Sequence, residues 1–227
     1  MDFRIDVPLS NWSMFIYGAW LTLRLMAISA SLGTAIGIVC AALKSSRIRL
    51  LGVIVSVYVN LFRNTPFIIQ LYFTFFALPS IHIDLDPNQT AVLILTINLG
   101  AYATEIIRGG IASVHPSQIE AGYSLGMNYL QVFRYVILAP AMKVIAPPLS
   151  NLIIMATLGS AIVAQISAQD LFYQALMLDN KTFRSFEIYI FVGLVYFVMA
   201  ECLYIFFSII NRKIFKVAPA ERLASTL

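Results

Sequence analysis

The sequence predicts an all-α membrane protein whose chain crosses the bilayer five times. Of its 227 residues, 60% are hydrophobic and only 11% are charged, and the mean hydropathy is +0.84. Soluble domains carry about 25% charged residues, so a chain this poor in charge could not stay in solution as a monomer. Five apolar runs each reach the roughly 20 residues that a membrane-spanning helix needs.

The five apolar runs cover residues 15–43, 51–78, 90–112, 144–164 and 187–210. The first two exceed the minimum length, so tilted or bent helices are expected there. Pro66 falls inside the second run and lacks a backbone donor, so a kink is expected at this position. Gly33 and Gly37 form a GxxxG pattern in the first run, which permits close approach of another helix. No internal repeat divides the chain, so residues 1–227 are predicted to form one transmembrane domain.

The distribution of Lys and Arg predicts how the chain is oriented. Ten of these residues lie in or beside connections that would share one side of the membrane: Lys44, Arg47, Arg49, Arg108, Arg134, Lys143, Arg212, Lys213, Lys216 and Arg222. Three lie on the other side: Arg4, Lys181 and Arg184. Because cytoplasmic connections carry the excess of positive charge, the N-terminus is predicted to be periplasmic and the C-terminus cytoplasmic. The connection 113–143 is then cytoplasmic.

Several classes of function find no support in the sequence. The chain has no GxxxxGK[ST] phosphate-binding loop, and no HExxH, CxxC or GxSxG motif. Cys40 and Cys202 both fall inside apolar runs, where cysteine is usually a small apolar side chain. We therefore expect no catalytic residues, no metal site and no cofactor in this chain. The net charge of +4 matches the basic edges of membrane proteins and does not require nucleic acid as a partner.

The connection 113–143 is a polar, helix-competent segment between two apolar runs. Polar residues such as Gln118 and Glu120 favour a position in water, outside the bilayer. Apolar residues such as Leu125 could pack against another surface. Gly122 and Gly126 are four residues apart, so they share one face if this segment is helical. The pattern fits two interpretations equally: a docking surface for a soluble partner, or an amphipathic connector that contacts only the membrane.

Several motifs then occur in a fixed order along the chain. They are Gly18-x3-Thr22, Arg63-Asn64-Thr65-Pro66, Ala101-Tyr102-x2-Glu105-Ile106-x-Arg108-Gly109-Gly110-Ile111, Gln118-x-Glu120-Ala121 and Pro147-Pro148-Leu149-x-Asn151. Over nearly the whole chain this series resembles the permeases of type I ABC importers, and within them the polar amino acid uptake branch. The segment around Glu120 resembles the cytoplasmic EAA loop of these permeases.

The resemblance implies a type I ABC importer permease in the bacterial inner membrane. Such a permease forms half of a translocation pore with a second, identical or homologous permease. Two ATP-binding subunits, which carry ATP and Mg, dock from the cytoplasm, and a substrate-binding protein docks from outside. The EAA loop implies that Glu120, Ala121, Gly122 and Gly126 couple this chain to the ATPase. The solute implied is a polar amino acid or an amino acid derivative.

The chain also departs from the family pattern. Gly122 replaces the second Ala of the EAA sequence, and the usual KDTSL segment reads Leu158-Gly159-Ser160-Ala161-Ile162, without its Lys and Asp. Because the resemblance places that segment near the substrate pathway, Gly159 and Ser160 are candidate pathway residues. Tyr102 and Glu105 in the third apolar run are the other two.

Two alternatives stay open on the sequence. Glu105 and Arg108 are three residues apart and can pair, so Glu105 either belongs to a structural ion pair or lines a substrate cavity. The alternative function is a secondary transporter or channel that acts without an ATPase. Such a protein is expected to show inverted repeats, and the sequence shows none.

Overall fold

The computed structural model describes residues 6–46 and 48–215, and all regular elements in these ranges are helical. The predicted all-α class is therefore confirmed. Four basic residues used to predict the orientation, namely Arg4, Arg47, Lys216 and Arg222, lie outside the described residues.

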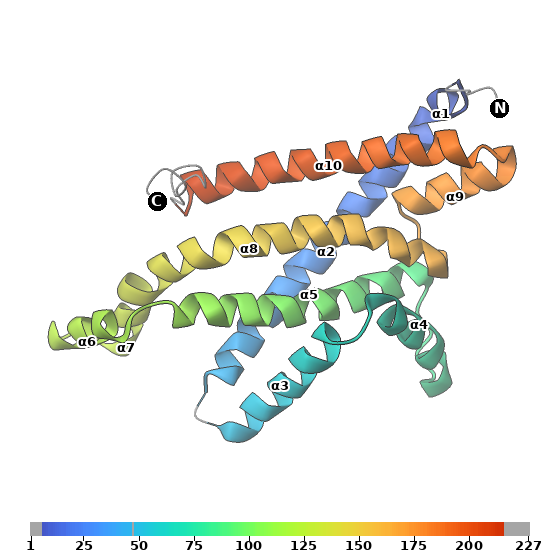
Figure 1. The fold of residues 1–227 in the computed structure, drawn as a ribbon. Helices are drawn as coiled ribbons and strands as arrows, with labels where there is room; N and C mark the ends of the chain where they lie inside the picture. Colours follow the sequence, from blue (N-terminus) through green and yellow to red (C-terminus); the bar gives the residue numbers. More distant parts are fainter. Residues whose placement is uncertain (1–5, 47, 216–227) are drawn as a thin grey trace.

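The helices follow one another as a bundle with short connections (Figure 1). They are α1 (Asp6–Ser10), α2 (Trp12–Lys44), α3 (Arg49–Arg63), α4 (Phe67–Ala77), the 3₁₀ turn η1 (Pro79–Ile81), α5 (Pro87–Ala112), α6 (Pro116–Ser124), α7 (Tyr129–Gln131), the π-type segment η2 (Val132–Ile137), α8 (Leu138–Gly159), the 3₁₀ segment η3 (Ser160–Ile166), α9 (Leu171–Thr182) and α10 (Ser185–Lys213).

Four continuous helical segments among the described residues are long and apolar enough to cross a membrane. They are α2, α5, the run Tyr129–Ile166 and α10, and the bent pair Arg49–Arg63 with Phe67–Ile81 makes a fifth if it counts as one span. The helix that contains the fourth apolar run begins at Tyr129, ahead of residue 144. The second half of the connection 113–143 is therefore continuous with a membrane helix.

The second apolar run is broken where Pro66 was expected to kink it. The two helices on either side meet at 107°, and Pro66 has an extended backbone. Gln70 Nε2 donates to the carbonyl oxygens of Phe62 at 2.9 Å and Thr65 at 3.0 Å, and Asn98 Nδ2 donates to Gln70 Oε1 at 2.9 Å. These side-chain amides supply hydrogen bonds to carbonyls that the break removes from the helix ladder, which makes a broken helix tolerable at membrane depth.

Among the described helices, α2 and α5 share the most extensive contact. A Cβ built at Gly33 would lie 2.8 Å from Leu99 Cβ, and one at Gly37 would lie 2.6 Å from Ala103 Cβ. Real Cβ atoms do not approach so closely, so only glycine permits this packing. The close helix approach predicted from the GxxxG pattern is confirmed.

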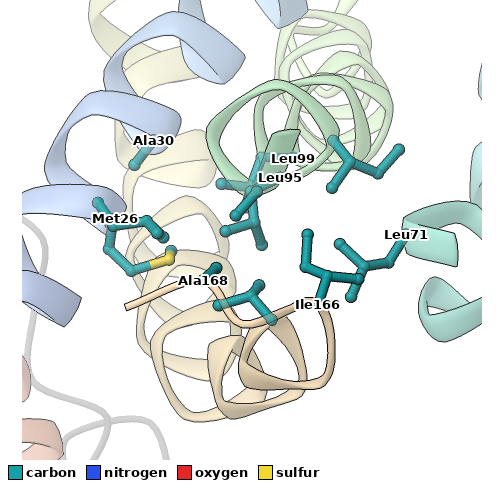
Figure 2. Close-up of a cluster of buried hydrophobic side chains, with 11 residues drawn as sticks. Met26, Ala30, Leu71, Leu95, Leu99, Ile166 and Ala168 are labelled. Carbon is teal, nitrogen blue, oxygen red and sulfur yellow. The ribbon is translucent and has the colours of Figure 1, made fainter. Parts of the chain in front are cut away.

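The largest buried apolar cluster lies where α2, α4, α5 and the segment after α8 converge (Figure 2). Its labelled members are Met26, Ala30, Leu71, Leu95, Leu99, Ile166 and Ala168. The cluster joins α2, α4 and α5 to the segment that follows α8. In Figure 1, α6 and α7 extend beyond the ends of α5 and α8, on the side where α10 ends, while α1 and α9 lie at the opposite end.

Candidate functional site

The first candidate site is the turn between α6 and α7. Gly126 has φ +77°, a left-handed conformation that favours glycine. Its N–H donates to Tyr123 O at 2.9 Å, and Met127 N–H donates to Gly122 O at 3.2 Å. These bonds satisfy carbonyls at the end of α6, so Gly126 terminates this helix in a tight turn.

The next helix starts immediately after the turn, at Asn128. Asn128 Oδ1 accepts from Gln131 N–H at 3.0 Å, and Gln131 Oε1 accepts from Asn128 N–H at 2.8 Å. This reciprocal capping box is a strong start signal for a helix. From here the chain is helical through Ile166, so the turn leads without a break into a membrane helix.

Gly122 faces its own chain rather than outward. It is buried, and a Cβ there would lie 3.2 Å from Val132 Cγ2 and 3.3 Å from Val136 Cγ2. α6 ends before Gly126, so the two glycines do not share a helix face. The condition for a shared glycine face, a helix that runs through both residues, is therefore not met, because the turn intervenes.

The exposed side of this region combines apolar side chains with one carboxylate. Leu125 is 78% exposed, Leu130 74% and Tyr129 69%. Glu120 and Ala121 on α6 are also exposed. We call these five residues the α6–α7 surface. Exposed apolar side chains that gather in one patch are typical of a surface that binds another protein or a membrane.

The second candidate site is a group of charges that joins α2 to α5. Glu105 Oε1 accepts from Lys44 Nζ at 2.7 Å, and Glu105 Oε2 accepts from Arg108 Nη2 at 2.9 Å. The pair of Glu105 with Arg108 was expected from their spacing. Lys44 was missed, because its place beside Glu105 follows only from the packing of α2 on α5.

The four candidate pathway residues have different environments. Tyr102 is half-buried, and the Arg63 guanidinium lies over its ring, 5.4 Å from the centroid. Tyr102 and Glu105 lie about one turn apart on α5. Ser160 is buried, and its hydroxyl donates to Thr157 O at 2.8 Å within its own helical segment. Gly159 is exposed, and among the described residues no atom would crowd a Cβ there.

Comparison with known proteins shows the family of the chain. The family described as "Binding-protein-dependent transport system inner membrane component" matches residues 33–216. The chain belongs to this family.

Relatives of this binding-protein-dependent transport component carry permease names. The L-cystine transport system permease protein TcyB of Bacillus subtilis (strain 168) is 34% identical over 92% of this chain and 89% of its own length. The arginine transport system permease protein ArtQ of the same organism is 33% identical over 94% of this chain and 97% of its own length. A crystal structure of an amino acid ABC transporter with histidines matches with a TM-score of 0.88 and 34% identity, over 94% of this chain and 100% of that one.

The resemblance to amino acid ABC transporter permeases is thus confirmed, as are the permease fold and the location. The chain is a multi-pass component of the bacterial inner membrane. Among the described residues, no group of three or more His, Cys, Asp or Glu side chains could hold a metal ion.

Proposed function

We propose that this chain forms half of the translocation pore of an ATP-driven importer for a polar amino acid or an amino acid derivative. The observation that carries the proposal is the α6–α7 surface. It presents apolar side chains outside the bundle, and it lies at the start of a helix that continues into the membrane.

In this proposal the chemistry of ATP belongs to two separate subunits that bind the α6–α7 surface and hold ATP and Mg. Glu120 and Ala121 offer contacts on α6, while Gly122 and Gly126 act from within by fixing the α6 packing and the turn. ATP-driven closure of those subunits moves the turn, and the helix from Tyr129 carries the motion to the pore. Coupling requires that ATP favours one of two pore states over the other.

The outer partners are a second permease, identical or homologous, and a substrate-binding protein on the periplasmic side. The decisive experiment is uptake into vesicles by this chain with and without the ATP-binding subunits. Uptake that requires both ATP and those subunits supports the importer. Uptake by this chain alone supports the alternative, a secondary transporter or channel.

We propose that Tyr102, Glu105, Gly159 and Ser160 lie along the substrate pathway. Glu105→Gln should then lower uptake or change solute preference while the complex still assembles. Its matched control is Glu201→Gln, which changes an exposed carboxyl group on α10. If instead the Glu105→Gln complex dissociates, the role of Glu105 is the structural one indicated by its bonds to Lys44 and Arg108.

The proposed orientation has its own test. A cysteine in place of Asp84 should react with a membrane-impermeant thiol reagent in intact cells, because the connection before α5 is proposed to be periplasmic. A cysteine in place of Gln118 on α6 should stay unlabelled until the membrane is opened. The reverse labelling pattern would refute the orientation.

A further inference from the structure

A cavity of about 540 Å³ lies between α2 and α5, away from both candidate sites. This volume falls within the range of small-molecule sites, about 300–1,000 Å³. Much of its wall is apolar, with side chains from both helices: Leu21, Leu25, Ile28, Leu32, Val92 and Leu93. Ile28 is 41% exposed and Leu32 50% exposed, so the cavity is a groove open to the surroundings of the bundle.

One arginine lies in this groove. Arg24 is exposed, and within the described part of the chain no ion pair joins it to a carboxylate. A cation on a membrane helix is costly unless it reaches the interface or finds a counter-charge. The groove therefore combines a long apolar wall with one positive charge that no described carboxylate neutralises.

The position of Arg24 along α2 fits the membrane interface. Tyr17 and Trp20, both more than half exposed, precede it on the same helix. Exposed Trp and Tyr side chains mark the interface, so Arg24 lies about one turn, or ~6 Å, below it. From Arg24 to Leu32 the groove follows α2 for about 12 Å toward the bilayer centre.

The polar groups of the groove also cluster at the Arg24 end. Asn88 and Gln89 stand in the first turn of α5, and Asn88 Oδ1 accepts from Gln169 N–H at 2.6 Å. Farther along α5, Thr96 is the one polar side chain among the lining residues from that part of the helix. A polar end and an apolar remainder match a molecule with a charged head and a hydrocarbon tail.

We propose that the α2–α5 groove binds an anionic phospholipid from the leaflet nearer the N-terminus of α2. The phosphate lies against Arg24, with the amide groups beside it, and one acyl chain packs along the apolar wall. A second permease copy is a poorer occupant, because it would bury the Arg24 charge unless it brought a carboxylate. A polar solute is also poorer, because the wall offers it few hydrogen-bonding groups.

The first test is native mass spectrometry of the purified permease–ATPase complex, exchanged into detergent with phosphatidylglycerol or with phosphatidylcholine. The wild-type complex should retain phosphatidylglycerol preferentially. Arg24→Gln should weaken that retention about fivefold, the effect of removing one cation beside an anionic headgroup. Lys181→Gln is the control, since Lys181 is an exposed cation on α9 outside the groove. Equal retention of both lipids, or equal losses in both variants, would overturn the proposal.

Three further variants separate the possible occupants. Ile28→Trp fills the groove and should abolish the preference while Arg24 remains. Thr96→Val removes the hydroxyl that has no hydrogen-bond partner among the described residues, and it should leave lipid retention unchanged. Loss of retention in Thr96→Val would indicate a polar ligand instead. A disulfide cross-link between two copies carrying Ile28→Cys would place the second permease on the groove and refute lipid binding. Because lipid retention is measured apart from uptake, these outcomes do not depend on the transport proposal.

Discussion

Two glycine pairs with the same spacing have opposite structural roles in this protein. Gly33 and Gly37 both lie inside α2 and both press against α5. Gly122 and Gly126 belong to the α6–α7 region, where the first packs against Val132 and the second forms the turn at φ +77°. Spacing alone does not tell these cases apart, because four residues define a face only where the helix is continuous.

The difference separates a region of two long, closely packed helices from a short helix held by fewer contacts. The α2–α5 contact is fixed by close backbone packing along two long helices and by the Lys44–Glu105 bond at 2.7 Å. α6 is short, and it packs against the start of the next helix through small contacts around Gly122. A permease needs both properties if a soluble subunit is to move a part of it without separating its membrane helices.

The largest effect is expected for Gly37→Leu. The Cβ of the new side chain would collide with Ala103 Cβ. Because one of these atoms belongs to α2 and the other to α5, the two helices must separate. We expect a destabilisation of at least about 3 kcal/mol, seen as loss of the monodisperse peak in size-exclusion chromatography. The control is Gly193→Leu on α10, where a Cβ would meet no described atom within 4 Å. If the two variants behave alike, close packing of α2 on α5 is not the reason for Gly37.

A smaller effect is expected for Gly122→Leu. The added side chain would displace α6 from Val132 and Val136, at a cost of about 1–3 kcal/mol confined to this region. The protein should still insert and melt near the wild-type temperature, but copurification of the ATP-binding subunit should fall. A normal yield of the complex would show that the packing of α6 does not matter for docking.

Substitutions of Gly126 show whether the turn requires glycine for its backbone conformation or because a partner needs room there. Gly126→Leu should cost about 1–2 kcal/mol locally, because non-glycine residues disfavour positive φ. Gly126→Asn should cost less, since asparagine tolerates this conformation. In Gly126→Leu, ATPase activity should no longer depend on loaded binding protein. In Gly126→Asn, the stimulation of ATPase activity by loaded binding protein should be close to normal. Equal uncoupling in both would mean that the partner's backbone approaches Gly126 closely.

Much of this architecture was predictable from local sequence. The apolar runs predicted the membrane helices, Pro66 marked the break, and Gly33 with Gly37 marked a close helix contact. The residues of the capping box at Asn128 also mark, in the sequence, the start of the helix that leads into the fourth apolar run. Non-local contacts were not predictable. The bond of Lys44 to Glu105 joins residues 61 apart and depends on how α2 packs on α5.

The smallest effect concerns pH at the opposite end of the molecule. Asp170 is buried beside the start of α9, accepts from Tyr173 N–H at 2.7 Å and from Tyr196 Oη at 3.2 Å, and its pKa is raised to about 6 chiefly by burial. The unfolded chain releases this proton near pH 3.9. The folded state therefore gains stability from the proton below about pH 4, and it loses this contribution as pH rises through about 6.

The corresponding measurement is the melting temperature in detergent at pH 4.5 and pH 7.5. Loss of the Asp170 proton should lower the melting temperature by a few degrees at pH 7.5 relative to pH 4.5. Asp170→Asn should remove this part of the difference between the two melting temperatures. An unchanged pH dependence in Asp170→Asn would show that the carboxyl group is not protonated in the folded state at pH 4.5.

We propose that the ATP-binding subunit docks on the α6–α7 surface. This proposal is tested most directly by placing a photo-crosslinking amino acid at Leu125, which is 78% exposed, or at Phe183, which is 86% exposed in the connection between α9 and α10 at the other end. In the assembled complex we expect Leu125 to cross-link to the ATP-binding subunit and Phe183 not to do so. Cross-linking of that subunit from Phe183, with none from Leu125, would contradict the account.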